Sequence, residues 1–283
     1  MSSESSFPAA PAAASPLRPT LANNLAVMGR VIFALMIRES RTRYGRSDLG
    51  YLWALFDPMI QILVLWIIFL LLQRVPPVPA SMPVFLLTGV LPYLFWRNCV
   101  SRGASAAPSN LQLLTYPQVS VFDVTLARVL LDSATLVVVT AIFIFGLRFT
   151  TGELFSHWER VPIIQATGVL ALFYFAICSA IFSSGMARIW PVWPQVFGYM
   201  GRPLYFATGI FFTLQSLPSG FRSLALYLPT AHLLEWIRTG TIPGFVSTSY
   251  NPWYPIEFGA VLLAIGMTIH WVLRLVGHSD ESH

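Results

Sequence analysis

The sequence predicts an all-α integral membrane protein with six transmembrane helices, an N-terminal amphipathic helix at the membrane interface and a re-entrant helical hairpin before the last span. Of its 283 residues, 55% are hydrophobic and only 10% are charged, whereas soluble domains carry about 25% charged residues. The mean hydropathy is +0.66. Too few polar residues remain to cover a water-soluble globule, so lipid is expected to replace water over much of the surface.

Six apolar stretches approach the length of about 20 residues that a helix needs to cross the hydrocarbon core. They cover approximately residues 57–73, 83–100, 121–147, 161–187, 193–214 and 253–276. Residues 49–276 are therefore expected to form one six-span transmembrane domain. The Ser/Pro/Ala-rich residues 1–20 are expected to form a disordered cytoplasmic tail, and residues 277–283 a short second tail.

Residues 21–48 precede the first span and carry an apolar stripe at helical spacing. The uninterrupted apolar run within them, residues 31–37, is too short to cross a bilayer. The stripe and the flanking arginines predict a helix in the plane of the headgroups. Packing of the same helix on a neighbouring domain is the alternative, and both can hold together. The stripe residues are Leu21, Leu25, Met28, Ile32 and Leu35, and the arginines are Arg30, Arg38, Arg41, Arg43 and Arg46.

The segment of about residues 215–240 contains two short apolar runs, separated by Pro218, Gly220 and Pro229. Neither run is long enough to span. Short interrupted helices of this kind predict a re-entrant hairpin, because irregular backbone at membrane depth must be covered by protein. Two short helices lying on the outer surface remain the alternative.

All 17 basic residues are arginines, and six of them precede the first span. The positive-inside rule then places both termini in the cytoplasm, with Arg74, Arg148, Arg160, Arg222 and Arg238 on the opposite side. The same topology accounts for the net charge of +5 without nucleic-acid binding. Because a Walker A loop requires lysine, any ATP-driven work must come from another polypeptide.

No set of residues forms a recognisable catalytic or metal-binding motif. The five histidines are scattered and none has the spacing of an HExxH site. Arg128 and Asp132 are four residues apart, so we expect them to pair with each other on one helical face. A membrane-embedded lipid or glycosyl transferase would need an acidic or His/Asp cluster, which makes it the weaker hypothesis.

Two arginines lie inside predicted spans, each beside aromatic residues. Arg97 follows Tyr93 and Trp96, and Arg202 lies between Tyr199 and Tyr205. An arginine at the bilayer centre costs at least about 2.5–3.5 kcal/mol, so such a residue usually faces a partner or a wet cavity. Guanidinium groups beside rings suit an anionic, sugar-bearing ligand. The alternative is that both side chains simply extend to the inner headgroups.

The loop of residues 101–118 is expected on the cytoplasmic side and contains the amphipathic stretch LQLLTYPQ. Exposed leucines and a tyrosine there are unfavourable in water unless a partner protein covers them. Packing back on the bundle is the alternative.

Three stretches of the sequence resemble a known family. The stretches RESRTRYGRSDLGYLWALFDP, FLLTGVLPYLFWRN and LLTYPQVSVFDVTLARVLLD are similar to the permease subunits of type-2 ABC exporters, in particular those of group-2 (Kps-type) capsular polysaccharide export. The resemblance covers about residues 25–276. The first stretch is shared with O-antigen exporters, and the other two favour the capsule branch.

The resemblance implies a homodimer of six-span subunits, each bound to a cytoplasmic ABC ATPase that holds the ATP and Mg²⁺, so that this chain needs no cofactor or metal. It also implies a lipid-linked acidic polysaccharide as substrate, with a periplasmic adaptor of the co-polymerase type and an outer-membrane channel. The hairpin is a family feature. The element that contacts the ATPase corresponds to Asn110, Leu111, Leu113, Leu114, Tyr116 and Pro117.

Substrate binding is expected at the inner leaflet, where cations attract an anionic glycolipid. We favour Arg43 and Arg46 within the N-terminal cluster, although Glu39 is also placed to pair with Arg43. The other expected substrate contacts are Trp53, Tyr93, Trp96, Arg97, Tyr199, Arg202 and Tyr205. An exporter of O-antigen or teichoic-type polymers is the nearest alternative, and a passive channel would not need the exposed loop.

Overall fold

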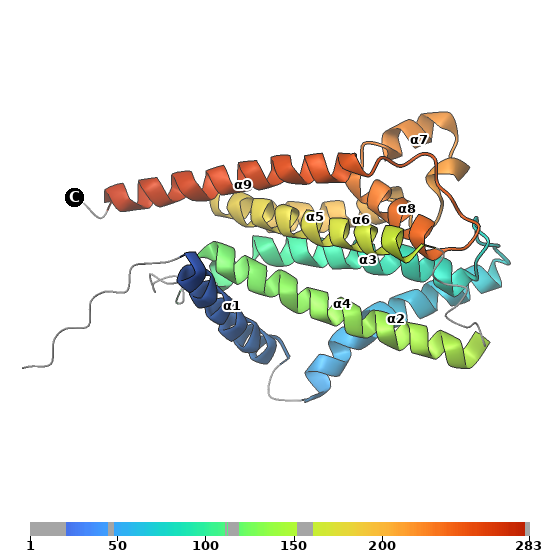
Figure 1. Cartoon of the computed structure of the whole chain (residues 1–283), viewed down its shortest axis with the longest axis horizontal. Helices are drawn as coiled ribbons and strands as arrows, with labels where there is room; N and C mark the ends of the chain where they lie inside the picture. The colour runs from blue at the N-terminus through green and yellow to red at the C-terminus, as the bar shows by residue number, and fades with distance from the viewer. Residues whose placement is uncertain (1–20, 45–47, 111, 113–118, 152–160, 281–283) are drawn as a thin grey trace, which may run out of the picture.

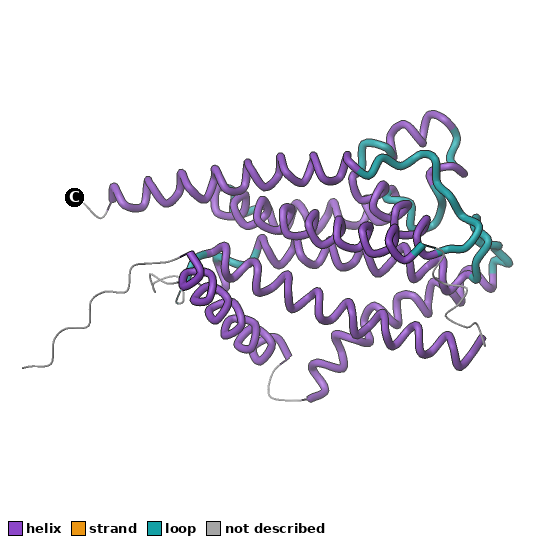
Figure 2. The backbone as a smooth tube through the Cα atoms, viewed as in Figure 1, coloured by secondary structure: helices purple, strands orange, loops and turns teal. Residues whose placement is uncertain are grey.

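A computed structural model describes residues 21–44, 48–110, 112, 119–151 and 161–280, and within these ranges the chain is helical without strands (Figure 2). The predicted all-α class is therefore confirmed. The expected tail of residues 1–20 lies outside the described residues. The helices are α1 (Leu21–Tyr44), α2 (Asp48–Leu71), α3 (Met82–Ala104), η1 (Pro108–Asn110), α4 (Val121–Thr151), α5 (Pro162–Ile189), α6 (Trp193–Ala207), η3 (Leu214–Ser216), α7 (Ser219–Ala225), α8 (Pro229–Thr241) and α9 (Trp253–Asp280).

The long helices lie side by side along one axis, with α3 and α5 at the centre (Figure 1). One end of this bundle holds α1, the C-terminal end of α9 and the turn of residues 105–110 that follows α3; we call residues 105–110 the elbow and this end the elbow end. The other end holds α7 and α8 and is called the hairpin end. From α2 to α5 successive helices alternate in direction along this axis (Figure 1), as expected of a multi-pass membrane protein.

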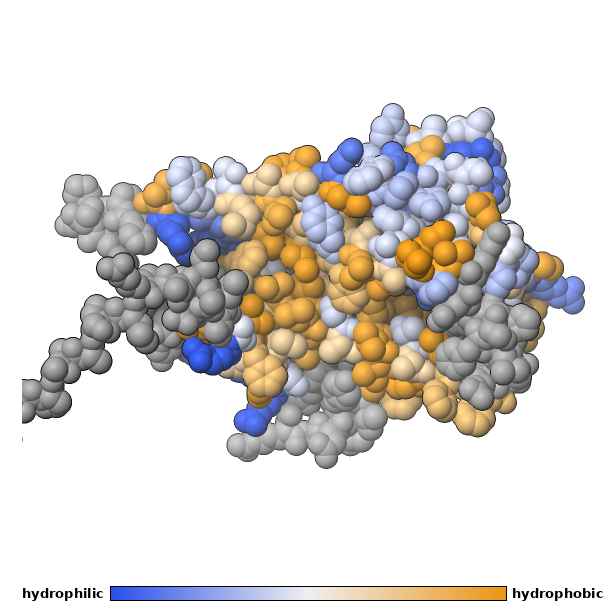
Figure 3. All heavy atoms as spheres, in the orientation of Figure 1, coloured by the Kyte–Doolittle hydropathy of each residue, from blue (hydrophilic) through white to orange (hydrophobic). Residues whose placement is uncertain are grey.

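Four helices of the described chain, α3, α4, α5 and α9, are long and apolar enough to cross a membrane. The apolar part of α2, Leu55–Leu71, is shorter. In Figure 3 apolar residues cover most of the visible face between the two ends, and the strongly hydrophilic residues lie toward the ends. This distribution matches the band of side chains that lipid would contact.

The remaining expected span, residues 193–214, is shorter than the sequence suggested. Its helix α6 has 15 residues and ends at Ala207, which gives a length of about 22 Å against the roughly 30 Å of a hydrocarbon core. The chain turns at Gly209, whose φ of +92° is readily adopted only by glycine. The boundary expected near residue 214 was therefore wrong, because the turn at Gly209 interrupts an otherwise continuous apolar run.

Helix α1 packs on the elbow end of the bundle. Its Ile32 and Leu35 are buried against Ala106 of the elbow and against Val124 and Ala127 of α4. On its other side Phe33 and Ile37 are 64% and 42% exposed. The packing foreseen as an alternative is thus present, and the opposite face of α1 is apolar and exposed.

The two helices at the hairpin end differ in their surroundings. Phe221, Leu224 and Tyr227, in α7 and just after it, are each at least 66% exposed. Helix α8 is buried along almost its whole length and lies beside the first two turns of α3 and α5, where Gly89 and Gly168 leave room for Arg238 and Ile237. A Cβ on Gly89 would be 2.6 Å from Nη2 of Arg238 and 3.2 Å from Cα of Ile210, so a larger residue there would have to displace the guanidinium.

Arg238 connects α8 to the segment that follows α6. Its side chain is fully buried. Nη1 donates hydrogen bonds to the carbonyl oxygens of Gly209 (2.7 Å) and Phe212 (3.1 Å), and Nη2 donates to that of Ile210 (3.0 Å). The guanidinium carbon lies 4.2 Å from the centre of the Phe85 ring. One cation therefore satisfies three carbonyls that the early end of α6 leaves without helical partners.

Glu235, one turn before Arg238, is buried as well, and its Oε1 accepts a hydrogen bond from the backbone N–H of Leu214 (2.9 Å). The sequence alone predicted Arg238 only as a charge on the outer side. The structure instead buries both side chains inside the bundle, because each has backbone partners there.

We predict that Arg238→Gln lowers the free energy of unfolding by about 3 kcal/mol, since glutamine cannot bind three carbonyls at once and leaves them buried without partners. The thermal unfolding midpoint in detergent, followed by tryptophan fluorescence, measures the loss. Arg222→Gln on α7 is the matched control: its guanidinium binds only Gln215 and Leu217 carbonyls near the surface. Equal losses for the two variants would contradict the role assigned to Arg238.

Candidate functional site

The aromatic residues predicted on the second span lie at the contact between α3 and α6. Tyr93 is fully buried, and its hydroxyl donates a hydrogen bond to the carbonyl of Gly201 (2.6 Å). Trp96 is 9% exposed, and its Nε1–H donates to Oγ of Ser179 on α5 (3.2 Å). The Trp96 ring also stacks on Phe175. Both residues thus hold α3 against its neighbours and present little ring surface to a ligand.

Arg97 follows these two residues and is only partly buried. Its side chain crosses α6 at Gly201, where an added Cβ would be 2.9 Å from Nε of Arg97. The glycine therefore makes the groove through which the guanidinium passes. Arg97 is therefore a partly accessible cation at the contact between α3 and α6.

The three residues predicted on the fifth span separate onto two faces of α6. Tyr205 is 9% exposed and packs edge to face on Tyr93, with ring centroids 5.3 Å apart. Tyr199 is 79% exposed, and Arg202, three residues later, is exposed too. Arg202 and Tyr199 thus share an outward face, and Tyr205 belongs to the buried cluster. The side chains of Arg43, Arg46 and Trp53 lie outside the described residues.

The elbow meets the expected ATPase-contact element only at Asn110, the one residue of that predicted set that the structure describes. Asn110, its last residue, is 4% exposed; its Oδ1 accepts a hydrogen bond from Nη1 of Arg38 (2.8 Å), and its Nδ2 donates to the carbonyl of Ala106 (3.0 Å). Asn110 therefore fixes the start of this element. The remaining residues predicted for it, Leu111, Leu113, Leu114, Tyr116 and Pro117, lie outside the described residues.

The ion pairs at the elbow end differ from those expected. Nε of Arg102 lies 2.9 Å from Oδ2 of Asp132, and Nε of Arg128 lies 3.0 Å from Oε1 of Glu39. The predicted pairing of Arg128 with Asp132 was wrong, because α1 and α3 bring closer partners to both. Glu39, which we placed beside Arg43, pairs with Arg128. Spacing along one helix could not reveal these contacts between helices.

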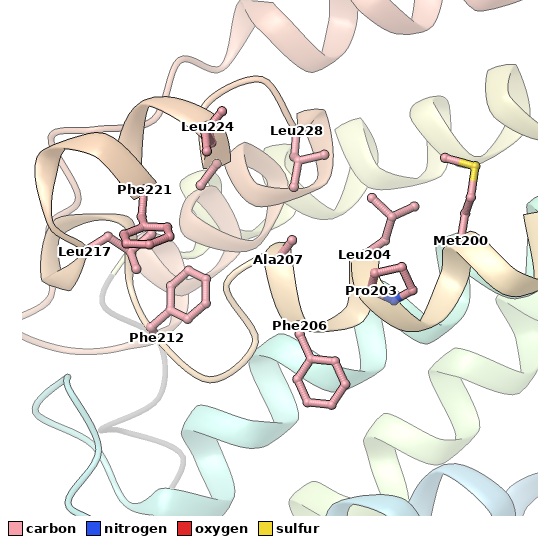
Figure 4. A pocket seen from close by; sticks show the side chains of 11 residues that line it. Met200, Pro203, Leu204, Phe206, Ala207, Phe212, Leu217, Phe221, Leu224 and Leu228 are labelled. Carbon is pink, nitrogen blue, oxygen red and sulfur yellow. The ribbon is translucent and has the colours of Figure 1, made fainter.

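An apolar hollow of about 630 Å³ lies between α6 and the helices of the hairpin end (Figure 4). Met200 and Pro203 line its α6 side, and Phe221 and Leu224 line its α7 side. Its lining carries no charged side chain. The hollow is suited to hydrocarbon and not to a hydrated sugar chain.

Within the described residues no group of three or more His, Cys, Asp or Glu side chains is placed to hold a metal ion. Sequence reasoning missed two features, the burial of Arg238 with Glu235 and the contacts of Arg128 across helices. The only available signal was a charged pair, Glu235 and Arg238, three residues apart in an otherwise apolar segment.

We predict that Tyr93→Phe lowers the free energy of unfolding by about 1 kcal/mol, the usual contribution of one buried hydrogen bond. The lost partner is the Gly201 carbonyl, which is then left without its donor. Thermal unfolding in detergent provides the measurement, and Tyr199→Phe on the exposed face of α6 should leave the midpoint unchanged. A Tyr93→Phe protein as stable as the wild type would show that this bond does not hold α3 on α6.

Comparison with known proteins places these features in a family. Residues 30–242 match the ABC-2 type transporter family. The polysialic acid transport protein KpsM of Escherichia coli is 31% identical over 238 residues, which cover 84% of this chain and 91% of KpsM. The capsule polysaccharide export inner-membrane protein CtrC of Neisseria meningitidis serogroup B is 30% identical over 251 residues, 87% of this chain and 92% of CtrC. The O-antigen export permease RfbA of Klebsiella pneumoniae is 23% identical over 263 residues, 87% of this chain and 93% of RfbA. The chain belongs to the ABC-2 type transporter family of membrane permeases.

Proposed function

We propose that this chain is the transmembrane subunit of an ATP-driven exporter that moves lipid-linked acidic capsular polysaccharide from the cytoplasm across the inner membrane. The observation that carries the proposal is the similarity to capsule permeases at about 30% identity along more than four-fifths of the chain. The O-antigen permease aligns over a similar length at only 23% identity, which supports the capsule branch.

The elbow end is the cytoplasmic end in this proposal, and both termini lie there. Of the described arginines, Arg30, Arg38, Arg41, Arg102 and Arg128 belong to α1 or to the adjoining ends of α3 and α4, which agrees with the positive-inside rule. The hairpin end then faces the periplasm, toward the adaptor and the outer-membrane channel.

Helix α8 is the inner arm of a re-entrant hairpin in this orientation. Its burial beside the first two turns of α3 and α5 supports insertion to a depth of about 10 Å from the outer ends of these helices. The short α6 and the hairpin then cross the membrane together, a distance that each of the longer helices crosses alone. Helix α1, with Phe33 and Ile37 exposed, rests on the inner headgroups.

The conduit is proposed to form between two copies of the chain. Two hollows of the described bundle are lined mainly by apolar side chains, whereas a hydrated anionic polymer needs polar walls and cations. The outward face of α6 with Tyr199 and Arg202, and the accessible Arg97, supply such groups. Tyr93, Trp96 and Tyr205 act in this proposal by holding Arg97 in place, and Arg43, Arg46 and Trp53 remain predicted contacts at the inner leaflet.

The energy is proposed to come from a separate cytoplasmic ABC ATPase, which binds ATP and Mg²⁺ and contacts the element that begins at Asn110. This chain is not itself an enzyme in the proposal. The overall test is to purify it with its ATPase and measure whether a lipid-linked acidic polysaccharide stimulates hydrolysis. Failure to form a complex, or stimulation by a neutral polymer only, would contradict the assignment.

We predict that Arg97→Ala lowers surface polysaccharide by about tenfold at an unchanged permease level, because one desolvated charge contact contributes about 1.4 kcal/mol or more. Arg202→Ala should act in the same direction. Gly201→Val should reproduce the effect by displacing Arg97, whereas Gly198→Val, whose added Cβ meets nothing within 4 Å, is the matched control. Normal export by Arg97→Ala and Arg202→Ala would support simple extension of both side chains to the headgroups.

We also predict that Leu113→Asp or Tyr116→Asp abolishes stimulated ATPase activity in the reconstituted complex while the permease still inserts in the membrane. A buried carboxylate at an apolar protein contact is strongly unfavourable. Gln112→Asp, a change at a polar position of the same stretch, is the control. ATPase stimulation at the wild-type level in Leu113→Asp would remove this element from the ATPase contact.

A further inference from the structure

A single buried guanidinium, that of Arg128, binds three parts of the chain at the elbow end. Its side chain is 7% exposed. Nη1 donates hydrogen bonds to the carbonyl of Arg102 in the last turn of α3 (3.0 Å) and to Oγ of Ser105 (2.9 Å), and Nη2 donates to Oγ of Ser109 (2.8 Å). Arg128 thus fixes the elbow from its first turn to η1.

The same guanidinium also holds α1. Nε lies 3.0 Å from Oε1 of Glu39, and Nη2 donates to Oε2 (3.4 Å). The neighbouring Arg38 adds a second link by donating to Oδ1 of Asn110 (2.8 Å). Two consecutive residues of α1 are therefore linked to the elbow, Arg38 directly through Asn110 and Glu39 through the guanidinium of Arg128 on α4.

These contacts differ in kind from the apolar packing around them. The contact of Ile32 and Leu35 with α4 is non-directional, so it fixes the position of α1 along α4 less sharply than directed hydrogen bonds do. A planar guanidinium with several fixed acceptors has a much narrower set of favourable geometries. The pair of Arg128 and Glu39 is also largely shielded from salt, because both side chains are mostly buried.

We propose that Arg128 and Glu39 couple α1 to the ATPase-contact element, so that α1 and the elbow move as one rigid body when the ATPase acts. Arg128 is a positioning residue in this account. The inference rests on the proposed function, because it takes the element beginning at Asn110 as the contact with the ATPase. A consequence of this rigid-body movement is that each ATPase cycle moves the arginines of α1 relative to the headgroups of the inner leaflet.

The test uses spin labels at Arg30→Cys on α1 and Pro108→Cys on the elbow, both exposed positions, in the permease–ATPase complex in lipid nanodiscs. The native Cys99 and Cys178 are buried and should not label. We expect one narrow inter-label distance, unchanged between the nucleotide-free state and the state trapped with ATP and vanadate. In Glu39→Gln the distribution should broaden and shift between the two states, and export per permease molecule should fall about tenfold, a typical coupling effect.

Thr42→Arg is the matched control. It raises the net charge by one, as Glu39→Gln does, at an exposed position of α1 whose hydroxyl bonds only to its own helix. It should leave both the distance and export unchanged. If Glu39→Gln does not assemble, Arg128→Lys replaces it, because lysine keeps the charge but cannot bind the carboxylate and the elbow acceptors together.

A wild-type distance that changes with nucleotide would overturn the proposal, as would a broad wild-type distribution. So would a narrow distance with normal export in Glu39→Gln, or the same loss in Thr42→Arg. Loss of thermal stability alone, with normal export per folded molecule, would reduce Arg128 to a structural role. Failure of the proposed function gives a different result, since the wild-type chain would then not bind the ATPase at all.

Discussion

The carbonyl groups beyond the C-terminal end of α6 impose the constraint on which the hairpin end depends. A 15-residue helix leaves them largely buried inside the bundle, away from water. Arg238 satisfies three of them from α8, and Glu235 accepts the N–H of Leu214 in return. Arg238, the turn at Gly209 and helix α8 therefore depend on one another. Without the early end of α6 the buried guanidinium of Arg238 would have no acceptors, and without Arg238 the carbonyls of the turn would have no donors.

The elbow end uses the same device. Arg128 binds a carbonyl, two hydroxyls and a carboxylate contributed by three segments. Elsewhere in the bundle, Gly201 leaves space for Arg97 and Gly89 leaves space for Arg238. Such multiple binding requires a planar group with several donors in fixed directions. In a chain whose basic residues are all arginines, buried arginines connect helices whose apolar surfaces alone specify little about register.

The helical class and the positions of four spans could be predicted because both follow from composition and length. The end of α6 could not, because Gly209 changes direction within an apolar run that reads as continuous. Tyr93 and Trp96 were predicted as ligand contacts, yet their rings are buried, since one sequence does not show which side of a span faces its neighbours. Arg128 and Asp132 have ideal spacing for each other, but contacts between helices decided their partners.

In the proposed orientation the hairpin end and the elbow end lie on opposite sides of the membrane. Labelling of single cysteines with a membrane-impermeant maleimide tests this most directly, using Leu224→Cys on α7 and Pro108→Cys at the elbow, both exposed. In sealed right-side-out spheroplasts Leu224→Cys should be labelled, and Pro108→Cys should react only in inverted vesicles. Labelling of both positions from the same side, or with the sides reversed, would contradict the account.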